Sequence, residues 1–209
     1  MQLLAVCIGA PQPTTAKSGT TGYFKKPQSG TVAIAPDGLA GDFIGDLDHH
    51  GGAEQAVYLF SQEDADWWAD ELGHPCPPGH FGENLRIAGF ESASLCLGDM
   101  ITIGEVVLQI TSPRIPCATY AAQNGGPAAL KAFYSAARPG AYARVLTSGD
   151  VHAGQTARLV PFDGEKITIG ENLAATQSGF TPDFLRRALA VPAHVEMHQI
   201  AHRKLGLAE

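Results

Sequence analysis

The chain has 209 residues, of which 44% are hydrophobic and 17% charged, as in an ordinary globular protein with a sizeable core. Its formal net charge of −7, with no compensating basic run, excludes a nucleic-acid polymer as partner. The first apolar run is too short for a signal sequence or a membrane span, and the four cysteines include no C-x-x-C pair, so we expect a cytoplasmic protein without membrane contact, zinc site or disulfides.

Short strands and many turns are predicted for most of the chain, which contains 24 glycines and 14 prolines. Two helices are expected among the strands: residues 65–72, introduced by Ser61 and ended by Gly73, and residues 128–137. Because we find no β-α-β alternation, the pattern predicts a mainly β fold, a barrel or a sandwich. The predicted strands are residues 3–8, 31–35, 56–60, 101–103, 106–111, 141–146 and 156–160.

The character of the chain changes after Pro161. Helices are predicted near residues 171–177, at 184–190 after the Thr181-Pro182 start signal, and at 192–205. We therefore divide the chain into a β domain, residues 1–162, and a three-helix extension, residues 163–209. The extension is relatively basic and is interpreted as an interaction surface, a lid or a dimer element; a homodimer is one possible assembly.

The segment from Ser112 to Tyr120 is the strongest candidate for chemistry. Pro113 and Pro116 end a strand and present Cys117 from a loop. Arg114 is always protonated, and a nearby cation favours the thiolate, which attacks electrophiles and binds soft metals. The alternative is that Cys117 is a small buried hydrophobic residue.

Three other stretches are candidates for lining a ligand site. The glycine-rich segment around His50, Gly51 and Gly52 brings backbone N–H groups close to a ligand, and at most one of the adjacent residues His49 and His50 is expected to face the site. The Pro/Gly-rich residues 76–85, which include Asn84, are expected to line a cleft. The loop carrying Lys25 is locally positive, although for any one of its lysines an exposed position in a surface loop is the favoured interpretation.

Six motifs, in this order and spacing, resemble the MOSC domain, a family named after the C-terminal domain of molybdenum-cofactor sulfurases. The resemblance covers about residues 1–162, and the helical tail is similar to the extension of the bacterial YiiM type. The motifs are Gly38-Leu-Ala-Gly-Asp42, His50-Gly51-Gly52 with Ala56-Val57, Phe81-Gly-Glu-Asn84-Leu85, Gly98-Asp99, Pro113-Arg-Ile-Pro-Cys117 and Gly140-Ala-Tyr-Ala-Arg144.

The resemblance implies a MOSC-type β-barrel that binds the molybdenum cofactor, Mo-molybdopterin, with Cys117 as catalytic residue and metal ligand. It also implies reduction of small N-hydroxylated substrates, such as 6-N-hydroxylaminopurine, to amines, a detoxification of N-hydroxylated bases. Pyridoxal phosphate is not expected. Electrons are expected from a separate flavin or iron–sulfur reductase, because the chain shows no motif for such a group. By the same resemblance the cofactor contacts are Arg114, Asn84, His50, Gly51 and Gly52, with Lys25 and Arg144 at its phosphate.

Two alternatives remain at this stage. One is a non-catalytic carrier or insertion factor that holds the cofactor or a persulfide on Cys117. The other, less favoured, is a metal-free cysteine enzyme with His50 as base, for which the sequence offers no orienting third residue.

Overall fold

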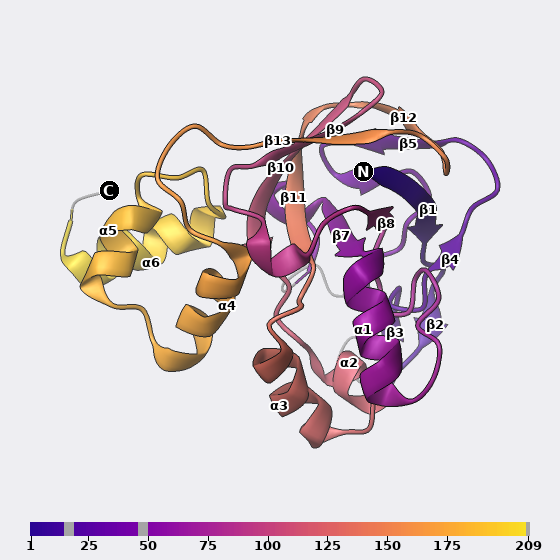
Figure 1. Cartoon of the computed structure of the whole chain (residues 1–209), viewed down its shortest axis with the longest axis horizontal. Coiled ribbons are helices and arrows are strands. Elements are labelled where there is room, and N and C mark those ends of the chain that lie inside the picture. Colours follow the sequence, from indigo (N-terminus) through magenta and orange to yellow (C-terminus); the bar gives the residue numbers. More distant parts are fainter. Residues whose placement is uncertain (15–18, 46–49, 208–209) are drawn as a thin grey trace.

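The computed structural model describes residues 1–14, 19–45 and 50–207. Its centre is a sheet of eight strands in the order β13-β9-β10-β11-β7-β8-β1-β4 (Figure 1). These strands are β1 (Gln2–Ile8), β4 (Lys26–Pro27), β7 (Val57–Ser61), β8 (Leu85–Ala88), β9 (Met100–Ile103), β10 (Val106–Pro113), β11 (Ala141–Thr147) and β13 (Ala157–Val160). Smaller sheets join β12 (Gly149–Val151), β5 (Val32–Ala35) and β6 (Gly38–Leu39), and β2 (Gln12–Pro13) with β3 (Thr20–Thr21).

The described residues also form six α-helices and two short 3-10 helices. The α-helices fall into two groups in space: α1 to α3 lie together at one end of the molecule, and α4 to α6 lie together beside β10 and β11 (Figure 1). They are α1 (Gln62–Leu72), α2 (Ala118–Gln123), α3 (Pro127–Ala136), α4 (Ile169–Ser178), α5 (Pro182–Ala188) and α6 (Val195–Leu205), with the 3-10 helices η1 (Ala53–Gln55) and η2 (Ser92–Ser94). No helix of this described part is long and apolar enough to cross a membrane.

The prediction of a closed β-barrel was wrong, because among the described residues the large sheet has two ends, at β13 and β4. The sheet does curl: Leu3 N–H donates to Gln155 O at 2.9 Å, and Gly154 N–H donates to Leu3 O at 2.7 Å. However, only an isolated bridge between Gln2 and Thr156 joins β1 to the segment before β13. Gly154, with φ of 94°, turns this segment, so the pairing does not continue as a ladder and the sheet stays open.

The expectation that the chain contains no β-α-β unit was also wrong at one place. Strands β7 and β8 are parallel, with Leu59 opposite Leu85, and α1 lies in the connection between them. The start and end of α1 follow the predicted signals: the Ser61 side chain accepts from Asp64 N–H at 2.9 Å, and Gly73 ends the helix with φ of 70°. The fold is therefore mixed α/β, with a large open sheet, rather than mainly β with a helical appendage.

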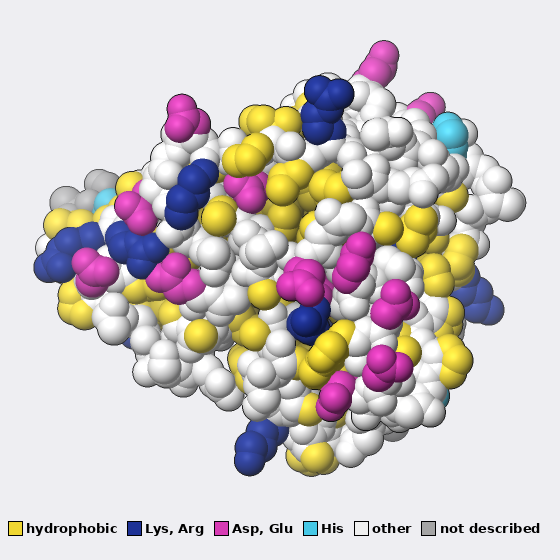
Figure 2. Space-filling model, viewed as in Figure 1, with side chains coloured by type: hydrophobic (Ala, Val, Ile, Leu, Met, Phe, Trp, Pro, Cys, Tyr) yellow, Lys and Arg dark blue, Asp and Glu magenta, His cyan; other side chains and the backbone are white. Residues whose placement is uncertain are grey.

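The three C-terminal helices form as predicted, but they share one hydrophobic core with the sheet. Ile101 and Leu108 from the sheet belong to the same buried cluster as Phe184, Met197 and Ala201. The boundary at residues 162 and 163 therefore stays a prediction. Figure 2 shows basic side chains interspersed with acidic ones over this group of helices, and acidic side chains gathered around α1.

A second buried cluster is aromatic and packs against Cys117, which lies in the loop between β10 and α2. Phe60 of β7 stacks on Phe81 with ring centroids 4.2 Å apart, and Trp68 of α1 stacks on Phe133 of α3 at 6.1 Å. Tyr120 of α2 packs edge-on against Phe133 at 4.9 Å. These contacts fix α2, and with it the Cys117 loop, against the sheet.

Candidate active site: a cysteine at the wall of a cavity

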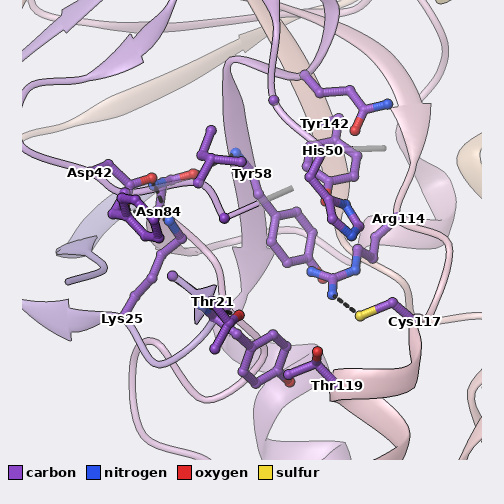
Figure 3. A pocket seen from close by; sticks show the side chains of 18 of the residues that line it. Thr21, Lys25, Asp42, His50, Tyr58, Asn84, Arg114, Cys117, Thr119 and Tyr142 are labelled. Atoms are coloured by element: carbon purple, nitrogen blue, oxygen red, sulfur yellow. Dashed lines mark hydrogen bonds and ion pairs between the residues drawn. The ribbon is translucent and has the colours of Figure 1, made fainter. Parts of the chain in front are cut away.

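A cavity of about 490 Å³ lies between the β10–α2 loop, the start of β7 and the loops before β4 and η1 (Figure 3). It brings together most of the residues that the sequence singled out, although they are spread over almost a hundred positions of the chain. Its walls include Lys25, Asp42, His50, Asn84, Arg114 and Cys117.

Cys117 immediately precedes α2 and is half-buried, with its sulfur directed at the guanidinium of Arg114 (Figure 3). Arg114 Nη2 lies 3.5 Å from Sγ. Burial alone would raise the pKa of Cys117, but a hydrogen bond from the His50 side chain, the charge of Arg114 and the backbone N–H of Tyr120 outweigh it and bring the pKa to about 6. The sulfur is therefore a thiolate at neutral pH.

The guanidinium of Arg114 is held rigidly, because the residue is only 5% exposed. Its carbon lies 5.1 Å from the ring centroid of Tyr58 and 5.7 Å from that of Tyr23, and Nη1 donates to the backbone oxygen of Phe81 at 3.3 Å. Sequence reasoning missed the two tyrosines, since nothing in a strand or loop pattern indicates which aromatic rings will enclose a distant arginine.

The opposite wall is organised by Asp42 (Figure 3). Its carboxylate accepts hydrogen bonds from Gly9 N–H at 2.6 Å and Asn84 Nδ2 at 2.8 Å, and it forms an ion pair with Lys25. Asn84 Oδ1 accepts from Tyr58 N–H at 3.1 Å, so its amide is fixed on both sides. Burial lowers the pKa of Lys25 while Asp42 opposes that shift. Asp42 appears in the sequence motif but was given no role there.

The glycine-rich segment contributes unequally. His50 and Gly51 line the cavity. Gly52 precedes η1 with φ of 75° and does not line it. His49 lies outside the described residues. We expected at most one of the two adjacent histidines to face the site; His50 does so, and the position of His49 is not described, so this expectation stays a prediction.

Arg144 is placed elsewhere. Its Nη2 contacts Glu54 Oε2 at 2.8 Å and the backbone oxygens of Pro192 and Ala193 at 3.1 and 2.7 Å. It therefore joins η1 and β11 to the start of α6 and is not part of the cavity wall. A contact with a cofactor phosphate stays a prediction that this placement does not support.

The other three cysteines are in environments that suppress the thiolate. Burial raises the pKa of Cys7 to about 12 and that of Cys76 to about 11. Burial, followed by the charge of Asp99, also raises the pKa of Cys96. Cys117 alone among the four has a lowered pKa, which distinguishes a reactive or metal-binding cysteine from structural ones.

Comparisons with known proteins agree on the family. A family model described as MOSC domain matches residues 46–158, more than half of the chain. The chain is 32% identical over 166 residues to "Uncharacterized protein YflK" of Bacillus subtilis, covering 78% of this chain and 75% of that protein. It is 31% identical over 145 residues to a protein named "Reductase" of Gibberella moniliformis, covering 68% of this chain and 26% of that much longer relative.

The fold also matches a solved structure. The crystal structure of YiiM from Geobacillus stearothermophilus is similar with a TM-score of 0.80 and 23% sequence identity, and the match covers 98% of each chain. The helices α4 to α6 are included in this match, so the likeness extends beyond the residues of the family model. The chain belongs to the MOSC domain family and has a YiiM-like fold.

Proposed function

We propose that this protein is a molybdenum-cofactor-dependent oxidoreductase that reduces N-hydroxylated compounds to amines, with Cys117 as the metal ligand. The observation that carries the proposal is a thiolate with a pKa of about 6 at the wall of a cavity of about 490 Å³. Support also comes from membership of the MOSC family, which is associated with molybdenum-cofactor binding, and from the name of the relative called "Reductase".

The residues present fit such a cofactor. Its metal is bound through sulfur-rich ligands, and a thiolate is a soft donor suited to complete that set. The cavity lies within the range of ordinary small-molecule sites. In addition, Tyr23 lines the cavity, and its buried hydroxyl has no hydrogen-bond partner among the described residues, so a polar ligand would satisfy it.

The chain's own groups have separable roles in this proposal. Cys117 supplies the sulfur, while His50 and Arg114 keep it deprotonated. Arg114, Asn84, Lys25 and the backbone around Gly51 hold the pterin and phosphate parts. His50, which donates a hydrogen bond to the sulfur, would pass a proton toward the departing oxygen in this proposal.

The cofactor, when bound, supplies the two-electron chemistry of the reaction. The N–O bond of the substrate breaks, two electrons and two protons are taken up, and an amine and water are formed. We assign the source of the two electrons to a separate flavin or iron–sulfur reductase.

The test is expression in a host that makes molybdenum cofactor, followed by metal analysis and an assay of 6-N-hydroxylaminopurine reduction with a chemical reductant. Wild type and Cys96→Ser should contain molybdenum and form the amine; Cys117→Ser should fold but lose both properties. Molybdenum binding without turnover would instead indicate a carrier. Wild-type turnover by Cys117→Ser with the cofactor loaded would refute the ligand role.

A further inference from the structure

A second cavity, of about 270 Å³, lies between β10 and the helices α4 and α6. It adjoins the Cys117 cavity, because His50, Gln55, Ile115 and Tyr142 line both. Its volume is just below the range of drug-sized sites, so it suits a ligand of one or two fused rings.

The walls of this cavity are held by specific polar contacts. His194 N–H donates to Thr111 O at 2.9 Å, which ties the start of α6 to β10. Glu54 Oε2 accepts from Val195 N–H at 3.1 Å and from Arg144. These hydrogen bonds fix the walls of the cavity where α6 meets β10, and Arg144 supports them from outside the cavity.

One buried polar atom in this cavity is left without a hydrogen bond by the residues that the structure describes. Asn172 of α4 lines the cavity and is 2% exposed, yet its Oδ1 has no hydrogen-bond partner among the described residues. An unpaired buried acceptor is costly, so a ligand donor is the natural partner. A carboxamide carries an acceptor and donors side by side, the pattern that pairs with the edge of a purine-like ring.

The remaining lining indicates the charge of the ligand. No Lys or Arg of the described chain lines this cavity, and the exposed Glu196 lies at its edge. Phe180, Met197 and Ile200 supply apolar surface for the faces of a ring. A phosphate or carboxylate would meet the carboxylate of Glu196 and no Lys or Arg of the described chain, whereas an uncharged heterocycle finds both apolar contacts and a hydrogen-bond acceptor.

We propose that this second cavity, with Asn172 as its polar anchor, binds the ring of the substrate as an uncharged N-hydroxylated heterocyclic base and excludes phosphorylated forms. The inference rests on the proposed function of the Cys117 cavity. His50 is one of the four residues that line both cavities, so a ring held by Asn172 can direct its N–O group toward the cavity that contains Cys117. The helices α4 and α6 would then determine specificity.

The experiment compares wild type with Asn172→Leu, which keeps the size but removes the acceptor, and Ile200→Trp, which fills the cavity from a half-buried position. Ser178→Ala, an exposed change on the same helix, is the control. Binding of 6-N-hydroxylaminopurine to cofactor-free protein is measured by calorimetry, and turnover by the loaded protein is measured with this base, with its ribonucleoside 5′-monophosphate and with N-methylhydroxylamine.

Both cavity variants should bind the base about tenfold more weakly than wild type or Ser178→Ala, the effect of about one net hydrogen bond for Asn172→Leu. They should raise KM for the base by a similar factor and leave turnover of N-methylhydroxylamine, which is too small to need the cavity, within about twofold. For wild type, kcat/KM for the monophosphate should be at least about tenfold below that for the base.

Unchanged binding and KM for the base in both variants, or equal losses with the base and N-methylhydroxylamine, would overturn the proposal while leaving the function in place. Efficient use of the monophosphate would overturn the assignment of an uncharged ligand. If wild type reduces none of these compounds but binds the base through Asn172, the proposed function fails and the binding site stands.

Discussion

Removing the His50 side chain should raise the pKa of Cys117 by roughly one to two units. A hydrogen bond to a charged group contributes about 1.5–3 kcal/mol, and one pKa unit corresponds to about 1.36 kcal/mol. The sulfur would thus titrate between about 7 and 8 in His50→Ala, compared with about 6 in the wild type. It would not return fully to the value of a free thiol, because Arg114 Nη2 remains 3.5 Å away.

The assay is the pH dependence of Cys117 alkylation by iodoacetamide, followed by mass spectrometry of the peptide in cofactor-free protein. Because the thiolate reacts, the rate should rise with pH and level off above the pKa. His152→Ala, which removes an exposed histidine that does not line the cavity, is the control and should behave as wild type. A wild-type midpoint near 8.5, or the same midpoint in His50→Ala, would refute the account of the thiolate.

Three further results are expected. Cys76→Ser should keep molybdenum and turnover, because burial raises the pKa of that thiol to about 11, whereas Cys117→Ser should lose both. Metal analysis and product chromatography measure the two properties, and equal behaviour of the two variants would contradict the prediction. Arg114→Ala should lower molybdenum occupancy about tenfold or more under limiting cofactor, since charge-assisted contacts are lost; full occupancy would remove Arg114 from the site. Glu83→Gln should lower the free energy of unfolding by about 3–5 kcal/mol in urea denaturation, because it breaks a fully buried ion pair with Arg86, and a loss below about 1 kcal/mol would show that this pair is not needed.

Some residues of the site bring charge to the cavity, and others only hold those charged or polar side chains in position. Asp42 belongs to the second kind, since it joins Gly9, Lys25 and Asn84 in one network. Its carboxylate also compensates the charge of Lys25, so an anionic part of the cofactor would have to share that ammonium group with Asp42. Arg114 belongs to both kinds, because it faces the sulfur and also supports Phe81.

The sequence alone predicted those features that neighbouring residues decide. Strand β1, the helix α1 with Ser61 and Gly73 at its ends, and the helix α6 ended by Gly206 were all indicated by local patterns and were confirmed. The same holds for the loop that presents Cys117, because Pro113, Arg114 and Pro116 lie within four positions of it. Such features depend on backbone dihedrals and caps, which act over a few residues.

Only the tertiary structure decided how distant segments meet. Asn84 and Asp42 are 42 positions apart, and Glu54 and Arg144 are 90 positions apart. The enclosure of Arg114 by Tyr23 and Tyr58, the parallel pairing of β7 with β8 and the open sheet likewise depend on many weak contacts acting together. No single residue type determines these contacts, because the packing of whole helices and strands decides which side chains become neighbours.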